Sequence, residues 1–264
     1  RSVDRYRLMA SLFKETLSHG ILIGAQTAAD AERFKAIGAA AERVRVTGNV
    51  KFDMEIPAAS IAAGRAFREQ CGPGRPVWIA GSTHEGEEAL ALDAHQRVLT
   101  QFPEALLLLV PRHPQRFDAV RELLAKRGER FASRSSGTVL PSDTAVMLGD
   151  TMGELMMFYA AADVALVAGS LVPIGGHNLL EPASLGRPVL TGPHNFNSEE
   201  IARLLLEAGA ARIVTDSGQL AAMVTELFGS TELCASMGAA GRSVLDANRG
   251  ALDRLLRLVE PLLE

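Results

Sequence analysis

Apolar residues along the chain occur in two arrangements, short continuous runs and longer stretches with helical spacing. The continuous runs include PVWIAGS at 76–82, ALLLLVP at 105–111 and DVALVAG at 163–169, which have the length and hydrophobicity of strands buried on both faces. Between them, residues 85–101 and similar stretches have apolar positions three and four apart, as helices do. Strands that alternate with helices predict the α/β class, with a Rossmann-like, doubly wound parallel sheet.

The same pattern extends over most of the chain. It predicts further strands near 130–134, 144–150, 187–193 and 211–216, and helices at 61–71, 115–127, 153–161, 178–185, 198–208, 217–228, 231–248 and 249–263. At the start, a helix at 3–17, a strand in HGILIGAQ, a helix in ADAERFKAIGA and a strand in ERVRVTGN predict a separate β-α-β segment.

The pattern loosens after Asp53, where MEIPAAS around Pro57 is typical of a linker. We therefore expect residues 1–56 to be the C-terminal part of a first Rossmann-like domain with its linker. Residues 57–248 are expected to form a second domain, and residues 249–264 a terminal helix that could fold back on the first. The chain starts at Arg1 without an initiator methionine, so we interpret it as part of a longer protein.

Composition excludes several classes of protein. Hydrophobic residues make up 47% of the chain and the net charge is -4 with mixed signs, which favours a globular protein without a nucleic-acid surface. Cys71 and Cys234 form no C-x-x-C pair, which indicates a reducing compartment and no cysteine metal site.

No apolar run approaches the roughly 18 to 20 residues that span a bilayer, so we expect a soluble chain. The predicted first helix carries Arg1, Arg5, Arg7 and Lys14, which could contact anionic lipid or form a solvated face.

Polar residues gather where predicted strands end. GSTHE at 81–85, PRHP at 111–114, GDTMGE at 149–154 and GGHNLLEP at 175–182 each follow an apolar run. Parallel topology places the carboxyl ends of all these strands on one rim, where open α/β sheets bind ligands. The sequence therefore predicts a ligand site on this rim.

The loop after residues 105–111 supplies a cation. Arg112 could bind a phosphate or pack over a base, or it could be a surface arginine paired with a carboxylate. His113 lies between two prolines and has no metal-ligand partners at suitable spacing, so we assign it orientation or hydrogen bonding.

Two loops combine with predicted helix starts. In GDTMGE, Thr151 or Asp150 could cap a helix that begins near Gly153, and its free N–H groups could bind an anion or a base edge. In GGHNLLEP, Gly175 and Gly176 would let the backbone approach a ligand. Asn178 and Glu181 have the spacing of a capping box.

The carboxylate of Glu181 could also accept hydrogen bonds from the two hydroxyls of a ribose. Ser82, Thr83 and His84 could contact substrate or cap the helix that follows, and the acidic EGEE at 85–88 is explained by the helix dipole. Lys51 could neutralise a leaving phosphate or be a solvated linker lysine. The sequence contains no P-loop, no D-x-D metal clamp and no G-x-S-x-G elbow, which argues against an ATPase, a metal-bridged sugar transferase and an α/β-hydrolase.

Four segments together resemble a known family. TGNVKFD, PRHPQRF, LGDTMGELMMFYAAADVALVAGS and GGHNLLEPASLGRPVLTGPH are similar to the 3-deoxy-D-manno-octulosonic acid (Kdo) transferases of lipopolysaccharide synthesis. The resemblance implies the GT-B glycosyltransferase architecture of two Rossmann-like domains facing a cleft, with the first, acceptor domain truncated here and the second binding the donor. It implies inverting transfer of Kdo from CMP-Kdo to a lipid A precursor at the cytoplasmic face of the bacterial inner membrane, without a metal or cofactor.

The resemblance also assigns roles to residues. Contacts with CMP would come from Pro111, Arg112, Met152, Gly153, Glu154, Asn178, Leu179, Leu180 and Glu181, and further contacts could come from Ser82, His84, His113, Gly176 and His177. Lys51 would stabilise the transition state. The family's general-base glutamate and its membrane contact belong to the part of the first domain that this chain does not match, so we expect the chain alone to be inactive.

Two alternatives stay open at this stage. The chain could be a nucleotide-binding fragment without turnover, or a UDP-sugar 2-epimerase or transferase of the same architecture.

Overall fold

The computed structural model describes residue 17, residues 21–137 and residues 140–263. The chain folds into two compact units. The N-terminal unit consists of the described residues up to Glu55 together with those from Leu245 onward, and the central unit is Ile56–Val244. The predicted first helix, with its basic residues, lies outside the described residues except for Leu17.

A seven-stranded sheet in the order β5-β6-β4-β3-β7-β8-β9 forms the centre of the central unit. Its described strands all pair in parallel, which confirms the doubly wound parallel sheet expected from the sequence. The strands are β3 Val77–Thr83, β4 Leu106–Pro111, β5 Phe131–Ser133, β6 Val146–Leu148, β7 Val164–Val167, β8 Val189–Thr191 and β9 Ala211–Ile213. Within this sheet β3 comes first along the chain. The next three strands, β4, β5 and β6, lie on one side of β3, and the chain then crosses to β7 on the other side. The strand order therefore reverses between β3 and β7.

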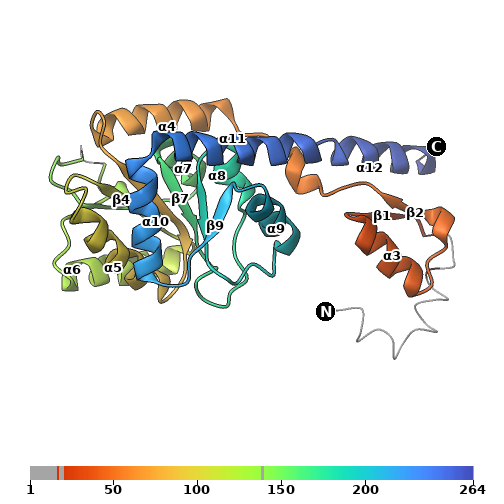
Figure 1. Ribbon diagram of the computed structural model, residues 1–264, viewed down its shortest axis with the longest axis horizontal. Helices are drawn as coiled ribbons and strands as arrows, with labels where there is room; N and C mark the ends of the chain where they lie inside the picture. Colours follow the sequence, from red (N-terminus) through yellow and green to blue (C-terminus); the bar gives the residue numbers. More distant parts are fainter. Residues whose placement is uncertain (1–16, 18–20, 138–139, 264) are drawn as a thin grey trace. The chain divides into compact units, whose positions relative to one another are not determined.

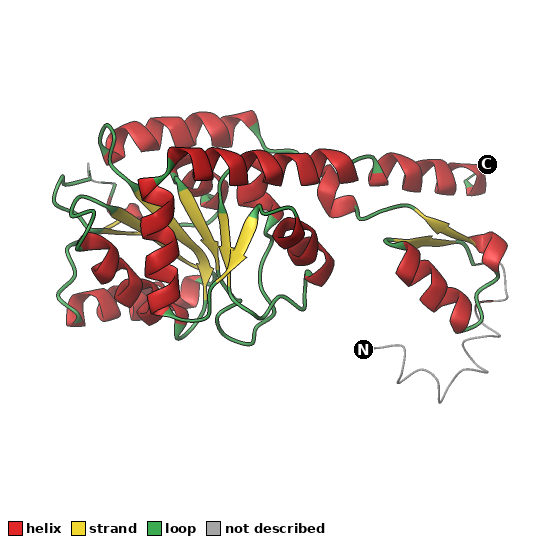
Figure 2. Cartoon of the chain, viewed as in Figure 1, coloured by secondary structure: helices red, strands yellow, loops and turns green. Residues whose placement is uncertain are grey.

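Helices connect the strands and cover both faces of the sheet (Figures 1 and 2). They are α4 Ala58–Cys71, α5 Glu87–Leu99, α6 Phe117–Lys126, α7 Leu155–Ala161, α8 Leu180–Ser184, α9 Glu199–Glu207, α10 Ser217–Gly229 and α11 Thr231–Asn248. Short 3-10 turns lie at η4 Pro114–Arg116 and η5 Arg134–Ser136. On one face α5 packs beside α10, and on the other α7 packs beside α4. Most predicted helices form, although several are one to three residues shorter at an end.

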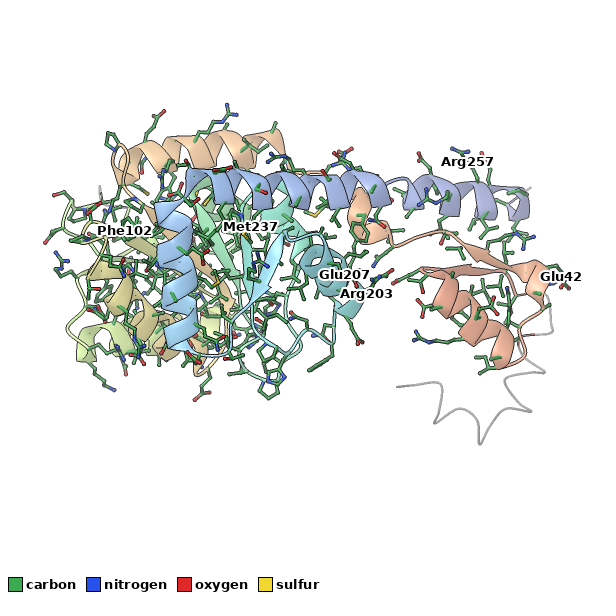
Figure 3. All side chains as sticks on the ribbon, viewed as in Figure 1. Glu42, Phe102, Arg203, Glu207, Met237 and Arg257 are labelled. Carbon is green, nitrogen blue, oxygen red and sulfur yellow. The ribbon has the colours of Figure 1, made fainter. Side chains whose placement is uncertain are left out.

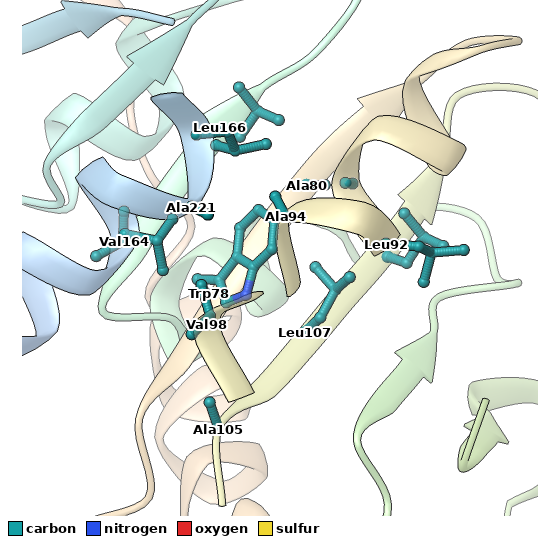
Figure 4. Close-up of a cluster of buried hydrophobic side chains, with 14 of the residues drawn as sticks. Trp78, Ala80, Leu92, Ala94, Val98, Ala105, Leu107, Val164, Leu166 and Ala221 are labelled. Carbon is teal, nitrogen blue, oxygen red and sulfur yellow. The ribbon is translucent and has the colours of Figure 1, made fainter. Parts of the chain in front are cut away.

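Trp78 lies at the centre of the core on the α5 and α10 face (Figure 4). Its fully buried indole packs among Val98 of α5, Leu107 of β4 and Val164 of β7. The indole Nε1 donates to Nδ1 of the buried His95 at 3.1 Å. Alternate residues of each strand supply this face, as the continuous apolar runs predict.

Side chains on the outer helices follow the same division between core and solvent (Figure 3). Met237 of α11 is buried and belongs to the core cluster of the sheet. Arg203 and Glu207, one turn apart on α9, form an exposed ion pair at 2.6 Å. No described helix is long and apolar enough to cross a membrane.

The N-terminal unit contains a small parallel pair of strands. β1 Ile23–Ala25 and β2 Val44–Val46 are joined by α3 Ala28–Ala36, whose first turn is capped by Thr27 Oγ1 accepting from Asp30 N at 2.9 Å. The 3-10 turns η2 Ala41–Arg43 and η3 Val50–Asp53 flank β2, and α12 Ala251–Val259 ends in η6 Glu260–Leu262.

Asp53 joins the two ends of the chain within this unit. Its carboxylate accepts from the backbone N–H groups of Gly250 and Leu252 at the start of α12, the latter at 2.7 Å. Burial raises the pKa of Asp53, but these backbone hydrogen bonds and Arg254 outweigh it and lower the pKa below its usual value. Arg254 Nε also donates to the carbonyl of Thr47 at 2.8 Å. The C-terminal helix is therefore an integral part of the N-terminal unit.

The buried His95 makes stability depend on pH. Nε2 donates to the carbonyl of Ala145 at 2.9 Å while Nδ1 accepts from Trp78, so the ring is neutral, and burial lowers its pKa to about 4. In the unfolded chain this histidine binds a proton below its ordinary pKa of 6.5, whereas in the folded chain it binds one only near pH 4. The free energy of unfolding should therefore fall as the pH drops from 6.5, by about 1.4 kcal/mol at pH 5.5 from this group.

Urea denaturation between pH 7 and 4.5 measures this effect. We expect His95→Gln to be less stable at pH 7 but to lose less stability on acidification. His194→Gln, at a partly exposed histidine in the loop after β8, serves as the control and should keep the slope of the unsubstituted protein. Equal slopes for all three proteins would contradict the assignment.

Candidate functional site

Three histidines meet at the carboxyl end of the sheet, where the strand order reverses. His84 follows β3 and His177 follows β7, and their rings stack with centroids 5.1 Å apart and planes 8° apart. The two Nε2 atoms are 2.8 Å apart, within hydrogen-bonding distance. His113, from the loop after β4, lies edge-on to His84 with ring centroids 5.4 Å apart. The structure thus brings together the loops that follow three neighbouring strands, at the position where such sheets bind ligands.

The His84–His177 pair is neutral. Burial is the largest cause that lowers the pKa of His177 to about 4, and the neighbouring His84, Arg112 and His113 contribute to the same shift. Burial also lowers the pKa of His84, although Glu87 opposes the shift. One Nε2 donates a hydrogen and the other accepts it, so the pair holds its geometry without charge.

Arg112 supplies the positive charge of the rim. Its backbone N–H donates to the carbonyl of Thr83 at 3.0 Å, which fixes it at the end of β4 directly after the buried Pro111. Its side chain is exposed and has no ion-pair partner among the residues that the structure describes. The guanidinium is close enough to lower the pKa values of His177 and Glu181. A surface ion pair, one of the two alternatives for this residue, is therefore not formed within the described chain.

Glu181 is a partly buried carboxylate with little hydrogen bonding. Its Oε1 accepts from Asn178 Nδ2 at a long 3.4 Å. Burial raises the pKa of Glu181, and Asn178 and Arg112 only partly offset this. Such a carboxylate retains the capacity to accept hydrogen bonds from a ligand.

The capping box predicted at Asn178 and Glu181 is wrong in detail. α8 begins at Leu180 with Leu179 in the capping position and no side-chain cap, so Asn178 does not open the helix. Asn178 Oδ1 instead accepts from Leu180 N, two residues on, at 3.2 Å. Leu179 and Leu180 are fully buried, backbone included, so in the described structure neither residue offers a surface to a ligand.

The glycine pair before His177 is required by packing within the protein. Gly175 and Gly176 have φ angles of 111° and 74°. A Cβ at Gly175 would lie 2.4 Å from Asn197 Nδ2, and one at Gly176 would lie 2.6 Å from Asn195 Oδ1. The close approach expected at these glycines is therefore to the loop after β8, and they shape the site indirectly.

The loop after β6 presents Met152 and Gly153 to solvent. Met152 is 60% exposed, and a Cβ at Gly153 would meet nothing within 4 Å. Glu154 beside them is paired with Arg134, whose Nη2 lies 2.7 Å from its Oε1, and this hydrogen bond lowers the pKa of Glu154. The loop therefore offers an open surface beside a carboxylate whose charge is already balanced.

The cap predicted for α7 is also wrong. α7 begins at Leu155, and Glu154 at its capping position makes no side-chain cap hydrogen bond. Asp150 is buried and accepts from Ser135 N at 2.8 Å and from Arg121 Nη2 at 2.7 Å, while the hydroxyl of Thr151 donates to Glu154. Asp150 and Thr151, the two residues expected to cap the helix, therefore hydrogen-bond to other groups and do not cap α7.

Glu87 is the residue that the sequence analysis missed. Its side chain is fully buried and accepts backbone N–H groups from His84 at 2.9 Å, Gly169 at 2.7 Å, Ser170 at 3.1 Å and Leu171 at 3.0 Å. It therefore ties the loop after β3 to the loop after β7, which the helix dipole alone does not explain. Its partners after β7 lie 82 to 84 positions away, and no local signal reveals them.

Ser82 has a strained backbone beside this carboxylate. It is buried, with φ of 61°, and is the one non-glycine residue of positive φ in the described chain. The register between β3 and β4 shifts there, between Gly81 and Thr83. α5 begins only at Glu87, with Gly86 at its capping position and no side-chain cap, so the helix-cap alternative for Ser82, Thr83 and His84 is wrong. Strain of this kind concentrates at functional sites.

Lys51 and the two cysteines were also singled out in the sequence. Lys51 is exposed in η3 of the N-terminal unit, where its backbone N–H donates to Asn49 Oδ1 at 3.1 Å. Cys71 is buried and Cys234 is partly buried, and burial raises the pKa of the Cys71 thiol to about 11. Within the described chain no group of three or more His, Cys, Asp or Glu residues is placed to hold a metal ion.

Comparison with known proteins identifies similar sequences. A family model described as 3-deoxy-D-manno-octulosonic-acid transferase (kdotransferase) matches residues 1–54. The 3-deoxy-D-manno-octulosonic acid transferase of Haemophilus influenzae is 42% identical over 265 residues, which cover 100% of this chain and 62% of that protein. The chain thus spans about three fifths of the length of this curated relative.

Solved structures agree with this similarity. The C-terminal CMP-Kdo binding domain of WaaA from Acinetobacter baumannii is 34% identical with a TM-score of 0.68, and the match covers 71% of this chain and 98% of that domain. HepE of Anabaena, solved with UDP and glucose, has a TM-score of 0.57 at 16% identity, covering 100% of this chain and 68% of that protein. The latter likeness shows the fold alone, and the solved neighbours share the GT-B glycosyltransferase architecture expected from the sequence.

Glu87 gives a direct test of the site's architecture. Glu87→Gln replaces a carboxylate that accepts four N–H groups with an amide whose NH₂ faces some of them. We expect a loss of about 2 to 4 kcal/mol in the free energy of unfolding, measured in urea. The exposed Glu85→Gln is the matched control and should change stability by less than about 0.5 kcal/mol. Equal stabilities of the two variants would contradict an anchoring role for Glu87.

Proposed function

The chain belongs to the Kdo transferase family, and on this premise we propose that its central unit binds CMP-Kdo as the donor half of a glycosyltransferase. The match to nearly all of a domain described as CMP-Kdo binding supports this proposal. So does the position of the rim residues, at the reversal of strand order where parallel sheets bind nucleotides.

The observation that carries the proposal is the partly buried, weakly bonded carboxylate of Glu181. We assign it to the two ribose hydroxyls of CMP, which can replace the long contact from Asn178 with shorter hydrogen bonds. Arg112, beside it and without an ion-pair partner in the described chain, is assigned to the phosphate. Met152 and Gly153, exposed on the neighbouring loop, are assigned to the base.

The proposed reaction is a single displacement. A hydroxyl oxygen of the acceptor attacks the anomeric carbon of Kdo, and the bond from that carbon to the phosphate oxygen of CMP breaks. The bonding electron pair stays on the phosphate oxygen, and a general base takes the proton of the hydroxyl. Displacement from the opposite side inverts the anomeric carbon. Side-chain cations, Arg112 and Lys51, offset the charge on departing CMP in place of a metal.

We assign the general base, the surface that binds the lipid A precursor as acceptor and the membrane contact to the part of the related transferases that this chain does not match. The site of action in this proposal is the cytoplasmic face of the inner membrane. The chain alone is then a binding protein for the donor, without turnover. A Kdo-transfer assay with radiolabelled donor tests this point, because measurable product from the chain alone would show that it contains the base.

Calorimetry with CMP tests the donor site. We expect Glu181→Ala to weaken CMP binding about tenfold, since hydrogen bonds to a charged group contribute about 1.5 to 3 kcal/mol. Glu199→Ala removes an exposed carboxylate from the first turn of α9 and should leave the affinity unchanged. Unchanged binding by Glu181→Ala would contradict the ribose contact. A preference for UDP over CMP would contradict the Kdo assignment and favour a UDP-sugar enzyme of the same fold.

A further inference from the structure

A cavity lies at the opposite end of the sheet from the proposed donor site. Its volume is about 420 Å³, and its lining includes Pro76, Asp163 and Pro188, which directly precede β3, β7 and β8. The carboxyl ends of the same strands carry His84 and His177. The proposed CMP contacts do not line this cavity.

Arginines give the cavity an excess of positive charge. Arg68 Nη2 pairs with Asp163 Oδ2 at 3.0 Å, and the same carboxylate oxygen accepts from the backbone N–H of Val77 at 2.8 Å. Arg187 also lines the cavity. Burial lowers the pKa of Arg187, Arg68 and Arg242 act in the same direction, and Asp163 and Cys234 oppose them. The lining thus carries two guanidinium groups and one carboxylate, which is already bonded to Arg68 and to Val77.

Arg187 also has an unused donor. Its Nη2 donates to the carbonyl of Ala160 at 2.6 Å, at the end of α7. Its Nε is buried and has no hydrogen-bond partner among the described residues. Because Nε is enclosed by protein, a ligand in the cavity would meet the other atoms of this side chain, which carries its positive charge into the lining.

The remaining wall of the cavity is largely apolar. Leu227 and Phe228 from the end of α10 line it, together with Cys234 and Ala235 of α11. This wall would suit an apolar group attached to an anion, because the arginines and the apolar side chains line the same space.

We propose that this cavity binds a small soluble organic oxyanion, a carboxylate or a phosphate monoester with an apolar body. Its oxyanion faces the side chains of Arg68 and Arg187, and its apolar part contacts Leu227 and Phe228, all of which line the cavity. The proposal rests on residues outside the donor site, so it stands or falls independently of the proposed function.

Phenyl phosphate and inorganic phosphate are suitable probes, added to the whole chain in the presence of saturating CMP. We expect saturable binding of phenyl phosphate by calorimetry, tighter than that of inorganic phosphate because the phenyl group contacts the apolar wall. In amide NMR spectra the shifts should move at Gly186 and Ala235, which line the cavity, and stay constant at Gly153 and Gly176 on the donor rim.

Two substitutions locate the binding. Arg187→Gln should weaken phenyl phosphate about tenfold by removing the guanidinium. Ala235→Trp replaces an exposed residue of the cavity wall, so it should block the binding of phenyl phosphate without a change to the buried core. Arg65→Gln, at an exposed position on the same helix as Arg68, is the matched control and should bind normally. If Arg187→Gln fails to fold, as its circular dichroism would show, Ala235→Trp still decides the question.

Three results would overturn the proposal. They are the absence of saturable binding of either probe, binding that Ala235→Trp leaves unchanged, and NMR shifts confined to the donor rim. None of them depends on whether CMP binds through Glu181.

Discussion

The geometry of the rim depends on one buried carboxylate. Glu87 stands at the reversal of strand order and accepts backbone N–H groups from both loops that meet there. A single side chain thereby satisfies four donors that would otherwise be buried without partners. It also fixes the separation of the loops that carry His84 and His177. The stacked histidines, the strained Ser82 and the glycine turns all lie beside this arrangement.

Charge is distributed unevenly around that anchor. The histidine pair is held neutral, Glu154 is balanced by Arg134, and the carboxylate of Glu87 is fully engaged by backbone N–H groups. Arg112 and Glu181 are the groups left with capacity for a ligand, one positive and one an acceptor. A nucleotide monophosphate presents the complementary pair, a phosphate and two vicinal hydroxyls. The ligand that this rim selects therefore depends on which charged side chains the protein leaves unpaired, as well as on which residues are present.

The sequence predicted the sheet well because burial of a strand on both faces, which is a property of the tertiary structure, shows as a run of consecutive apolar residues. Each run bounded by polar residues implied a strand buried on both faces, and parallel topology then placed His84, His113 and His177 on one rim. Local helix-capping rules were less successful. Asp150 and Asn178 had the spacing of helix caps, yet neither caps a helix. Asp150 accepts hydrogen bonds from Arg121 and Ser135, and Asn178 lies one residue before the capping position of α8 and accepts from Leu180 N. Glu87 could not be assigned, since three of its four partners come from the loop after β7, more than eighty residues away.

The bonds from Asp53 to Gly250 and Leu252 have a consequence for how the protein is made. They join residues 197 and 199 positions apart inside one compact unit. A ribosome releases these partners almost two hundred residues after Asp53, so the N-terminal unit is completed only after the whole central unit has been synthesised. The central unit has its whole sequence in one continuous segment and can fold earlier. The central unit can therefore fold before the unit that precedes it, and loss of α12 would leave the Asp53 carboxylate without its backbone partners.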